Sequence, residues 1–142
     1  MKGKWHLIVA MLVFIPLWIL IPAIQLTDIF YPIVLTILPD IDLKFDSLGH
    51  RSVITHSLLI PLIVYVFNPY MVNLLIILSV GIHCSCDVTL KPKRWQGGYT
   101  IKVLKIRNPW RGWMVKKSLN GNWSTVWLLS QFLLACGVVM FT

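Results

Sequence analysis

Six side chains of the kinds that bind metal ions lie near the ends of apolar stretches of the chain. They are a pair of aspartates, two histidines around the start of the next stretch, and a His–Asp pair in a third: Asp40, Asp42, His50, His56, His83 and Asp87. His83 and Asp87 are four residues apart, so on a helix both project from one face. An ionisable group at membrane depth costs about 2.5–3.5 kcal/mol on insertion scales, which marks it as a candidate for function. The spacing therefore predicts a metal site where membrane helices reach the surface.

The segments that must position these residues are strongly apolar. The chain has 142 residues, of which 57% are hydrophobic and only 13% charged. A soluble domain of this size could not bury so much apolar surface, so the composition predicts an all-α polytopic membrane protein with one domain over residues 1–142. We expect about five transmembrane segments, at residues 5–25, 29–39, 52–67, 71–90 and 123–141. The second is short, since it covers only about 17 Å of a hydrocarbon core about 30 Å thick.

The basic residues predict the orientation of these segments. If all five cross the membrane, the thirteen Lys and Arg residues lie on one side. The positive-inside rule then places the amino terminus and the 91–122 loop in the cytoplasm and the carboxyl terminus outside, in a cytoplasmic (inner) membrane. The first segment lacks a small-x-small cleavage site after it, so we expect a retained helix and not a signal peptide. In this topology the candidate ligands fall at similar depth near the cytoplasmic face.

The loop at 91–122 is basic and aromatic. Residues 91–117 hold nine of the cations, interleaved with Trp95, Tyr99, Trp110 and Trp113. A partial period-two pattern at Tyr99–Ile106 favours a strand or one arm of a hairpin. Each cation near an anionic leaflet contributes about 1 kcal/mol, so anionic lipid headgroups are the expected partner. A plain topology signal is the alternative, and nucleic acid is disfavoured.

Cysteine use gives no disulfide framework, because the chain has three cysteines. Cys84, Cys86 and Cys136 lie in apolar segments, where small buried thiols are ordinary. Cys84 and Cys86 flank the face of His83 and Asp87, so one of them as a further ligand stays an alternative.

Three motifs in order resemble a known family. They are L-P-D-I-D at 38–42, H-R followed by T-H-S within 50–57, and H-x-x-x-D at 83–87. This order resembles the YdjM-like predicted membrane-bound metal-dependent hydrolases over about residues 25–90. The stretch HRSVITHS is one residue longer than the usual H-R-G-x-T-H-S, and Leu43-Lys44 follows the aspartates where many members have His-Pro. The resemblance implies hydrolysis of a phosphoester or phospholipid substrate.

The resulting hypothesis assigns a role to each candidate residue. One or two divalent metals, with zinc expected, would be held by the following ligands: Asp40, Asp42, His56, His83 and Asp87. His50 would be peripheral, and Arg51 would neutralise charge on phosphoryl oxygens. Ser57 or Thr55 would orient a ligand by hydrogen bonding.

The alternative hypothesis is a non-enzymatic membrane module. The same residues would then hold a structural metal or a polar network, and the basic loop would bind lipid or a partner protein. An enzyme site should leave an open coordination position, whereas a structural site should be closed. The sequence does not determine the substrate or the oligomeric state.

Overall fold

The computed structural model describes residues 4–44, 52–89, 100–120 and 122–142. Within these ranges the chain forms five α-helices, one 3-10 helix and one antiparallel pair of strands. In chain order they are α1 (Lys4–Leu20), α2 (Leu26–Leu35), η1 (Leu38–Lys44), α3 (Leu59–Phe67), α4 (Met71–Thr89), β1 (Thr100–Asn108), β2 (Gly112–Asn120) and α5 (Asn122–Phe141). The prediction of a mostly helical chain is confirmed.

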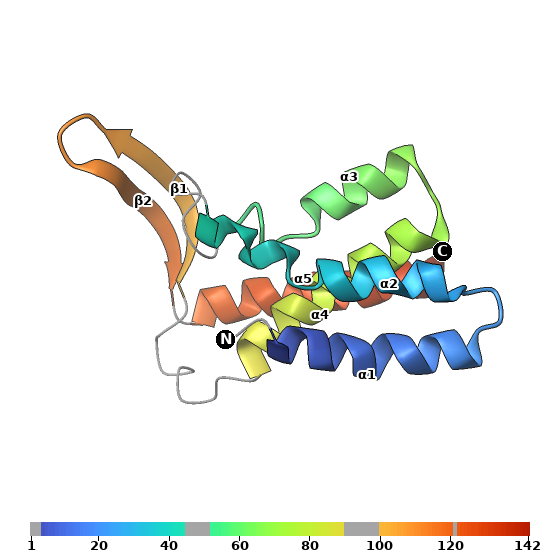
Figure 1. The fold of residues 1–142 in the computed structure, drawn as a ribbon. Helices are drawn as coiled ribbons and strands as arrows, with labels where there is room; N and C mark the ends of the chain where they lie inside the picture. Colours follow the sequence, from blue (N-terminus) through green and yellow to red (C-terminus); the bar gives the residue numbers. More distant parts are fainter. Residues whose placement is uncertain (1–3, 45–51, 90–99, 121) are drawn as a thin grey trace.

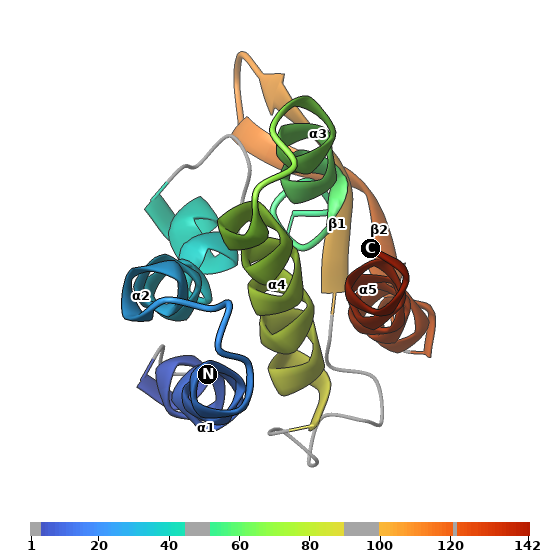
Figure 2. The ribbon, with the colours of Figure 1, turned by 90° about the vertical axis from the view of Figure 1, so that its right-hand side faces the viewer.

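The helices form a bundle around α4. Viewed along the bundle, α4 lies at the centre, and α1, α2, α3 and α5 each pack against it (Figure 2). Successive helices run in alternating directions, so the start of α1, η1 and the strands lie at one end of the bundle (Figure 1). The carboxyl terminus lies at the other end. We call the first of these the hairpin end.

The helix predicted over 52–67 is shorter than expected, because α3 begins only at Leu59. Pro61 lacks the N–H that would bond to the carbonyl of Ser57, and its ring clashes with that carbonyl, so a helix cannot continue backward through this point. Residues 52–58 form turns instead. Side chains of α5 satisfy part of their backbone: Gln131 Oε1 accepts from the Leu58 N–H at 3.0 Å, and Trp127 Nε1 donates to the His56 carbonyl at 2.9 Å.

The helix predicted over 29–39 is displaced toward the amino terminus. It begins at Leu26, three residues before the predicted start, and Asp28 accepts from the Gln25 N–H at 2.9 Å within its first turn. Pro39 cannot donate a helical hydrogen bond, and the chain continues beyond α2 as the separate 3-10 helix η1. The prediction for the first segment, 5–25, was also too long, since α1 ends at Leu20, two residues before Pro22.

Part of the predicted basic loop is a β-hairpin. β1 and β2 pair antiparallel from Thr100 opposite Asn120 to Asn108 opposite Gly112. Gly112 has φ of +69°, a left-handed conformation that suits the turn. Ile101 is buried in the core at the root of the hairpin, while Trp110 at its tip is 94% exposed. The hairpin is therefore anchored in the bundle and projects away from it (Figure 1).

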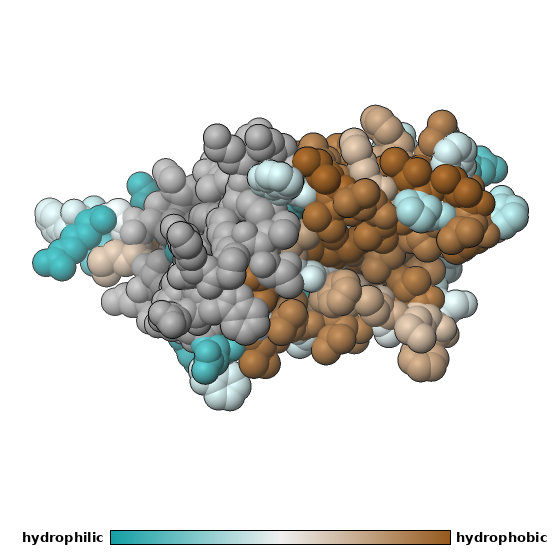
Figure 3. Space-filling view, turned by 90° about the horizontal axis from the view of Figure 1, so that it is seen from below, coloured by the Kyte–Doolittle hydropathy of each residue, from teal (hydrophilic) through white to brown (hydrophobic). Residues whose placement is uncertain are grey.

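In the described part of the chain, two helices are long and apolar enough to cross a membrane, namely α4 over Met71–Val88 and α5 over Asn122–Phe141. α1 and α2 are apolar but shorter. With 9 residues, α3 extends only about 14 Å. The lengths in the described ranges thus do not support five complete crossings. Apolar residues nevertheless dominate the visible surface of the helical part, whereas hydrophilic residues gather at the hairpin (Figure 3).

Candidate metal centre

Five ionisable side chains from four parts of the chain meet at the hairpin end of the bundle. They are His6 on α1, Asp40 on η1, His56 in the turns before α3, and His83 and Asp87 on α4. We call these five residues the His/Asp cluster. Ligand atoms lie within 4.8 Å of one another in two overlapping groups, His6–His83–Asp87 and Asp40–His56–His83. Either group could hold a metal ion.

The pair on α4 forms the centre of the cluster. His83 Nε2 is 3.9 Å from Asp87 Oδ2 and 3.9 Å from Asp40 Oδ1. Asp87 Oδ2 is also 3.6 Å from His56 Nε2. The four-residue spacing therefore places both side chains on one face of α4, as a two-ligand site on a helix requires.

A hydrogen bond to α2 orients His83. Its Nδ1 is 2.7 Å from the carbonyl oxygen of Thr36, the residue that ends α2. A carbonyl can only accept, so Nδ1 carries the hydrogen, and in the neutral imidazole Nε2 is then the nitrogen with the lone pair, on the side of the carboxylates. Ser79, one turn earlier on α4, donates to the Pro32 carbonyl at 2.6 Å and holds α2 against α4. A histidine metal ligand usually has this kind of backbone partner.

His56 is oriented by its neighbour Thr55. The Thr55 hydroxyl is 3.2 Å from the Ser52 carbonyl, to which it donates, and 3.0 Å from His56 Nδ1. A hydroxyl has one hydrogen, so its oxygen accepts from His56 Nδ1–H in this arrangement. His56 Nε2 then also carries a lone pair facing the cluster. Thr55 therefore contacts His56, and its role in orienting a metal ligand, which was assigned to Ser57 or Thr55, stays a prediction.

The donor atoms in the cluster fit a cation. The Nε2 atoms of His56 and His83 face each other at 3.4 Å, beside two carboxylates. Two lone pairs at this distance repel unless a proton or a metal ion lies between them. Zinc bonds of about 2.0–2.2 Å in a tetrahedron separate neighbouring donors by about 3.3–3.6 Å. Four of the pairs lie 3.4–3.9 Å apart, close to that range, and the ligand atoms of each group lie within 4.8 Å of one another, so binding would require the group to contract.

His6 is a member of the cluster that the sequence reasoning missed. Its ring stacks on His83 with centroids 4.1 Å apart and planes at 14°, and its Nε2 is 3.8 Å from Asp87 Oδ1. Neither ring nitrogen has a hydrogen-bond partner among the described residues, although the side chain is buried. Its depth could have revealed it, because His6 lies one turn into the first apolar segment, on the side already predicted for the other ligands.

Asp40 is the accessible member of the cluster. Its side chain is 16% exposed, whereas those of His6, His56 and His83 are fully buried. η1, which follows the end of α2 at Leu35, brings Asp40 to 3.9 Å from His83. The cluster is thus closed on the side of α1 and α4 and open on the side of η1.

Three of the remaining predicted site residues lie partly or wholly outside the described part of the chain. The backbone of Asp42 lies in η1, but its side chain is outside the described part of the chain, as are His50 and Arg51 altogether. The Ser57 hydroxyl donates to the Ile54 carbonyl at 3.1 Å, a local turn contact, so its catalytic role stays a prediction.

The two cysteines of α4 belong to apolar packing. Cys84 is buried with Leu58 and Ile77, and Cys86 is buried with Phe14 and Ile82. Both are free thiols. Their surroundings match the ordinary expectation of small buried side chains, and the alternative of a cysteine ligand gains no support from them.

Comparisons of the chain with protein-family models, with curated proteins and with solved structures gave no match. The function is therefore argued from the cluster and its surroundings.

Proposed function

We propose that this protein is a membrane-embedded, metal-dependent hydrolase that acts on a phosphoester or lipid-linked substrate at the cytoplasmic leaflet. The observation that carries the proposal is the His/Asp cluster, in which imidazoles and carboxylates form two overlapping groups that share His83. The order of the motifs at 38–42, 50–57 and 83–87 is the support for grouping the chain with the YdjM-like hydrolases.

Membrane insertion is inferred from the surface of the helices. α5 has only 22% of its span buried, and large apolar side chains such as Leu133 are exposed on it. α1 likewise exposes Leu12 and Ile19. Exposed apolar surface of this extent marks contact with lipid or another protein. In our proposal α4 and α5 span the bilayer, the shorter helices pack beside them, and the hairpin end faces the cytoplasm because it carries the cations.

The residues that would hold the metal are those of the cluster. His56 and His83 would contribute Nε2, and Asp40 and Asp87 a carboxylate oxygen each, with His6 beside them. A divalent ion bound there would supply Lewis acidity for adding water to a phosphoester. Zinc suits this mixed nitrogen and oxygen donor set. Asp42 remains a proposed ligand from the sequence.

The chain's own groups account for the remaining requirements of hydrolysis. In the overall reaction the oxygen of water bonds to phosphorus, the bond to the leaving oxygen breaks, and a proton passes from the water to the leaving alcohol. Asp40 is the accessible carboxylate, and we propose that the oxygen it does not give to the metal accepts that proton first. Arg51, next to the turns that hold His56, is proposed to neutralise charge on the phosphoryl oxygens.

The alternative is a non-enzymatic module with a structural metal or a polar network. The burial of His6, His56, His83 and Asp87 favours it, because structural sites are closed. The exposure of Asp40 on the open side of the cluster favours the enzyme.

Metal analysis combined with a hydrolysis assay separates these functions. We expect the purified protein to contain a divalent metal, and His83→Ala or Asp87→Ala to lower metal affinity by at least tenfold, since even outer-shell changes cost 10–100-fold. Hydrolysis of a phospholipid or a chromogenic phosphodiester should fall in parallel. Cys136→Ala, on the neighbouring helix, is the matched control and should change neither. Full metal content without any hydrolysis would favour the structural module, and a metal-free wild type would refute both metal-dependent roles.

The hairpin is proposed to bind anionic headgroups. Replacing Lys102, Lys105 and Arg107 together by Gln should weaken association with phosphatidylglycerol vesicles, because each cation contributes about 1 kcal/mol. The effect should shrink with added salt, since exposed charges are screened within about 8–10 Å at 0.10–0.15 M ionic strength. Metal content should stay unchanged. If vesicle binding changes neither with the substitutions nor with salt, the cations serve only as a topology signal.

A further inference from the structure

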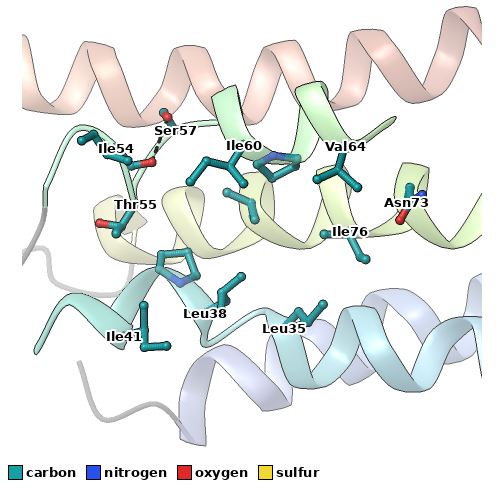
Figure 4. A pocket seen from close by; sticks show the side chains of 13 residues that line it. Leu35, Leu38, Ile41, Ile54, Thr55, Ser57, Ile60, Val64, Asn73 and Ile76 are labelled. Atoms are coloured by element: carbon teal, nitrogen blue, oxygen red, sulfur yellow. Dashed lines mark hydrogen bonds between the residues drawn. The ribbon is translucent and has the colours of Figure 1, made fainter. Parts of the chain in front are cut away.

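An apolar pocket lies beside the His/Asp cluster. Its volume is about 420 Å³, within the range of about 300–1,000 Å³ that ligand sites occupy. The walls come from the end of α2, from η1, from the turns before α3, and from α3 and α4. Figure 4 shows Thr55 and Ile41 at one end of the pocket and Asn73 at the other, so it is elongated along the helices.

The lining of the pocket suits hydrocarbon. Leu35, Leu38, Ile60, Val64 and Ile76 are among the side chains that point into it (Figure 4). Polar lining groups are few, and they sit toward the ends: Thr55 and Ser57 at one end, Asn73 at the other. Sites for small molecules combine such apolar walls with a few polar groups that fix the orientation of the ligand.

The pocket is open along one side. Leu38 on η1 and Val64 on α3 lie on opposite walls of it, offset along its length, and are 39% and 46% exposed. Val64 belongs to α3, whose exposed side chains are apolar, whereas η1 also carries Asp40, so in a bilayer the α3 side of this opening would face lipid tails. A chain could thus enter sideways from the hydrocarbon region without crossing a polar surface.

One end of the pocket adjoins the cluster. Thr55 lines the pocket and is hydrogen-bonded to His56, and Pro39, which also lines it, directly precedes the accessible Asp40. The root of the basic hairpin is bound here as well, since the Val53 N–H donates to the Lys102 carbonyl at 2.9 Å. Apolar walls, metal-type ligands and a basic element therefore follow one another in space, in the order of the tail, ester region and anionic headgroup of a phospholipid.

We infer that the pocket between α2, η1, α3 and α4 binds one acyl chain of an anionic phospholipid and places its ester and phosphate region at the His/Asp cluster. The role of that lipid as a substrate rests on the proposed hydrolase function. The binding of the acyl chain does not, because the pocket exists without any group of the cluster lining it.

Photo-crosslinking tests this inference independently of hydrolysis. The probe is phosphatidylglycerol with a diazirine in one acyl chain, incorporated into phosphatidylcholine nanodiscs with the full-length, metal-loaded protein. We expect adducts on Leu35 and Ile76 in the pocket to exceed those on Leu133 of α5, which is 67% exposed and reports ordinary lipid contact. Equal labelling of the two regions would overturn the inference.

Matched variants on α3 locate the binding. Val64→Trp places an indole in the opening and should lower the pocket adducts about tenfold, the effect of losing contact with a few methylene groups. Val66→Trp changes a neighbouring valine that is 74% exposed and is not part of the lining, so labelling should persist. Leu38→Trp repeats the test from the opposite wall in case Val64→Trp folds poorly. Equal loss in the Val66 variant would overturn the proposal.

Two further outcomes keep the pocket and the enzyme separate. His83→Ala should lose the metal but retain the pocket adducts; loss of both would show that the pocket depends on the cluster and would overturn acyl-chain binding as an independent property. Pocket adducts in a protein without hydrolysis would support chain binding and contradict the hydrolase. Protection of the pocket in nanodiscs that hold two copies would assign it to a second copy and overturn the lipid assignment.

Discussion

α4 and α5 are nearly equal in length and both are apolar enough to cross a membrane, yet they occupy opposite environments. In α4, 72% of the span is buried, whereas in α5 the share is 22%. α4 has polar residues along its buried faces, including Ser79, His83 and Asp87. α5 presents exposed apolar side chains over most of its surface. Apolar composition thus makes both helices long and apolar enough to cross a membrane, and the positions of the polar residues show which of them lies at the centre.

α4 and α5 pack closely against each other where both have small residues. A Cβ added to Gly81 on α4 would lie 2.6 Å from the Cβ of Ala135 on α5. Small residues at such an interface let two helices approach closely, which is how membrane helices gain packing energy. Earlier in α5, Trp127 and Gln131 support the turns that hold His56. α5 therefore acts as the support of the cluster while most of its surface faces outward.

Of the substitutions that test this difference between α4 and α5, a charge at the centre of the exposed face of α5 should have the largest effect. Leu133→Arg should reduce insertion by about 2.5–3.5 kcal/mol if that face contacts lipid. The fraction of protein retained in carbonate-washed membranes measures the effect. Met140→Arg is the control, because that exposed residue lies at the helix end, where a long side chain can reach the interface. Equal retention of both variants and the wild type would contradict lipid exposure of α5.

Replacing a glycine by alanine, on α4 or on α5, should have a smaller effect and tests the contact between the two helices. Gly81→Ala should destabilise the bundle by about 1–3 kcal/mol, because overpacking forces two helices apart. Gly137→Ala on α5 meets no atom within 4 Å and should stabilise by about 0.5–1 kcal/mol through its helix propensity. Thermal unfolding of the detergent-solubilised variants measures both effects. A Gly81 variant as stable as the wild type would mean that the helices do not touch at Ala135.

Sequence reasoning succeeded where local spacing determines the structure. The four-residue spacing of His83 and Asp87 fixed a shared face, and the bounds of α4 and α5 agree with prediction to within one residue. It failed where a single proline or a distant side chain decides. Pro61 shortened α3, and α5 stabilises the turns at 52–58 through contacts more than 70 residues away in the chain.

The candidate site was anticipated in part for the same reason. Depth along apolar segments grouped Asp40, His56, His83 and Asp87, and the structure brings these four together. His6 was overlooked because a lone histidine in an apolar helix has no local partner to mark it. Its relation to His83 is a stacking contact between two helices, which only the packing of α1 against α4 creates.

The most direct test of the central claim is X-ray absorption spectroscopy of the metal in the purified protein. The account predicts a first shell of nitrogen and oxygen alone at about 2.0–2.2 Å, with imidazole scattering that weakens in His83→Ala. The free thiols of Cys84 and Cys86, adjacent in sequence to His83 and Asp87, make the experiment discriminating. A sulfur shell near 2.3 Å, or an imidazole signal unchanged by the substitution, would contradict the assignment of the metal to the His/Asp cluster.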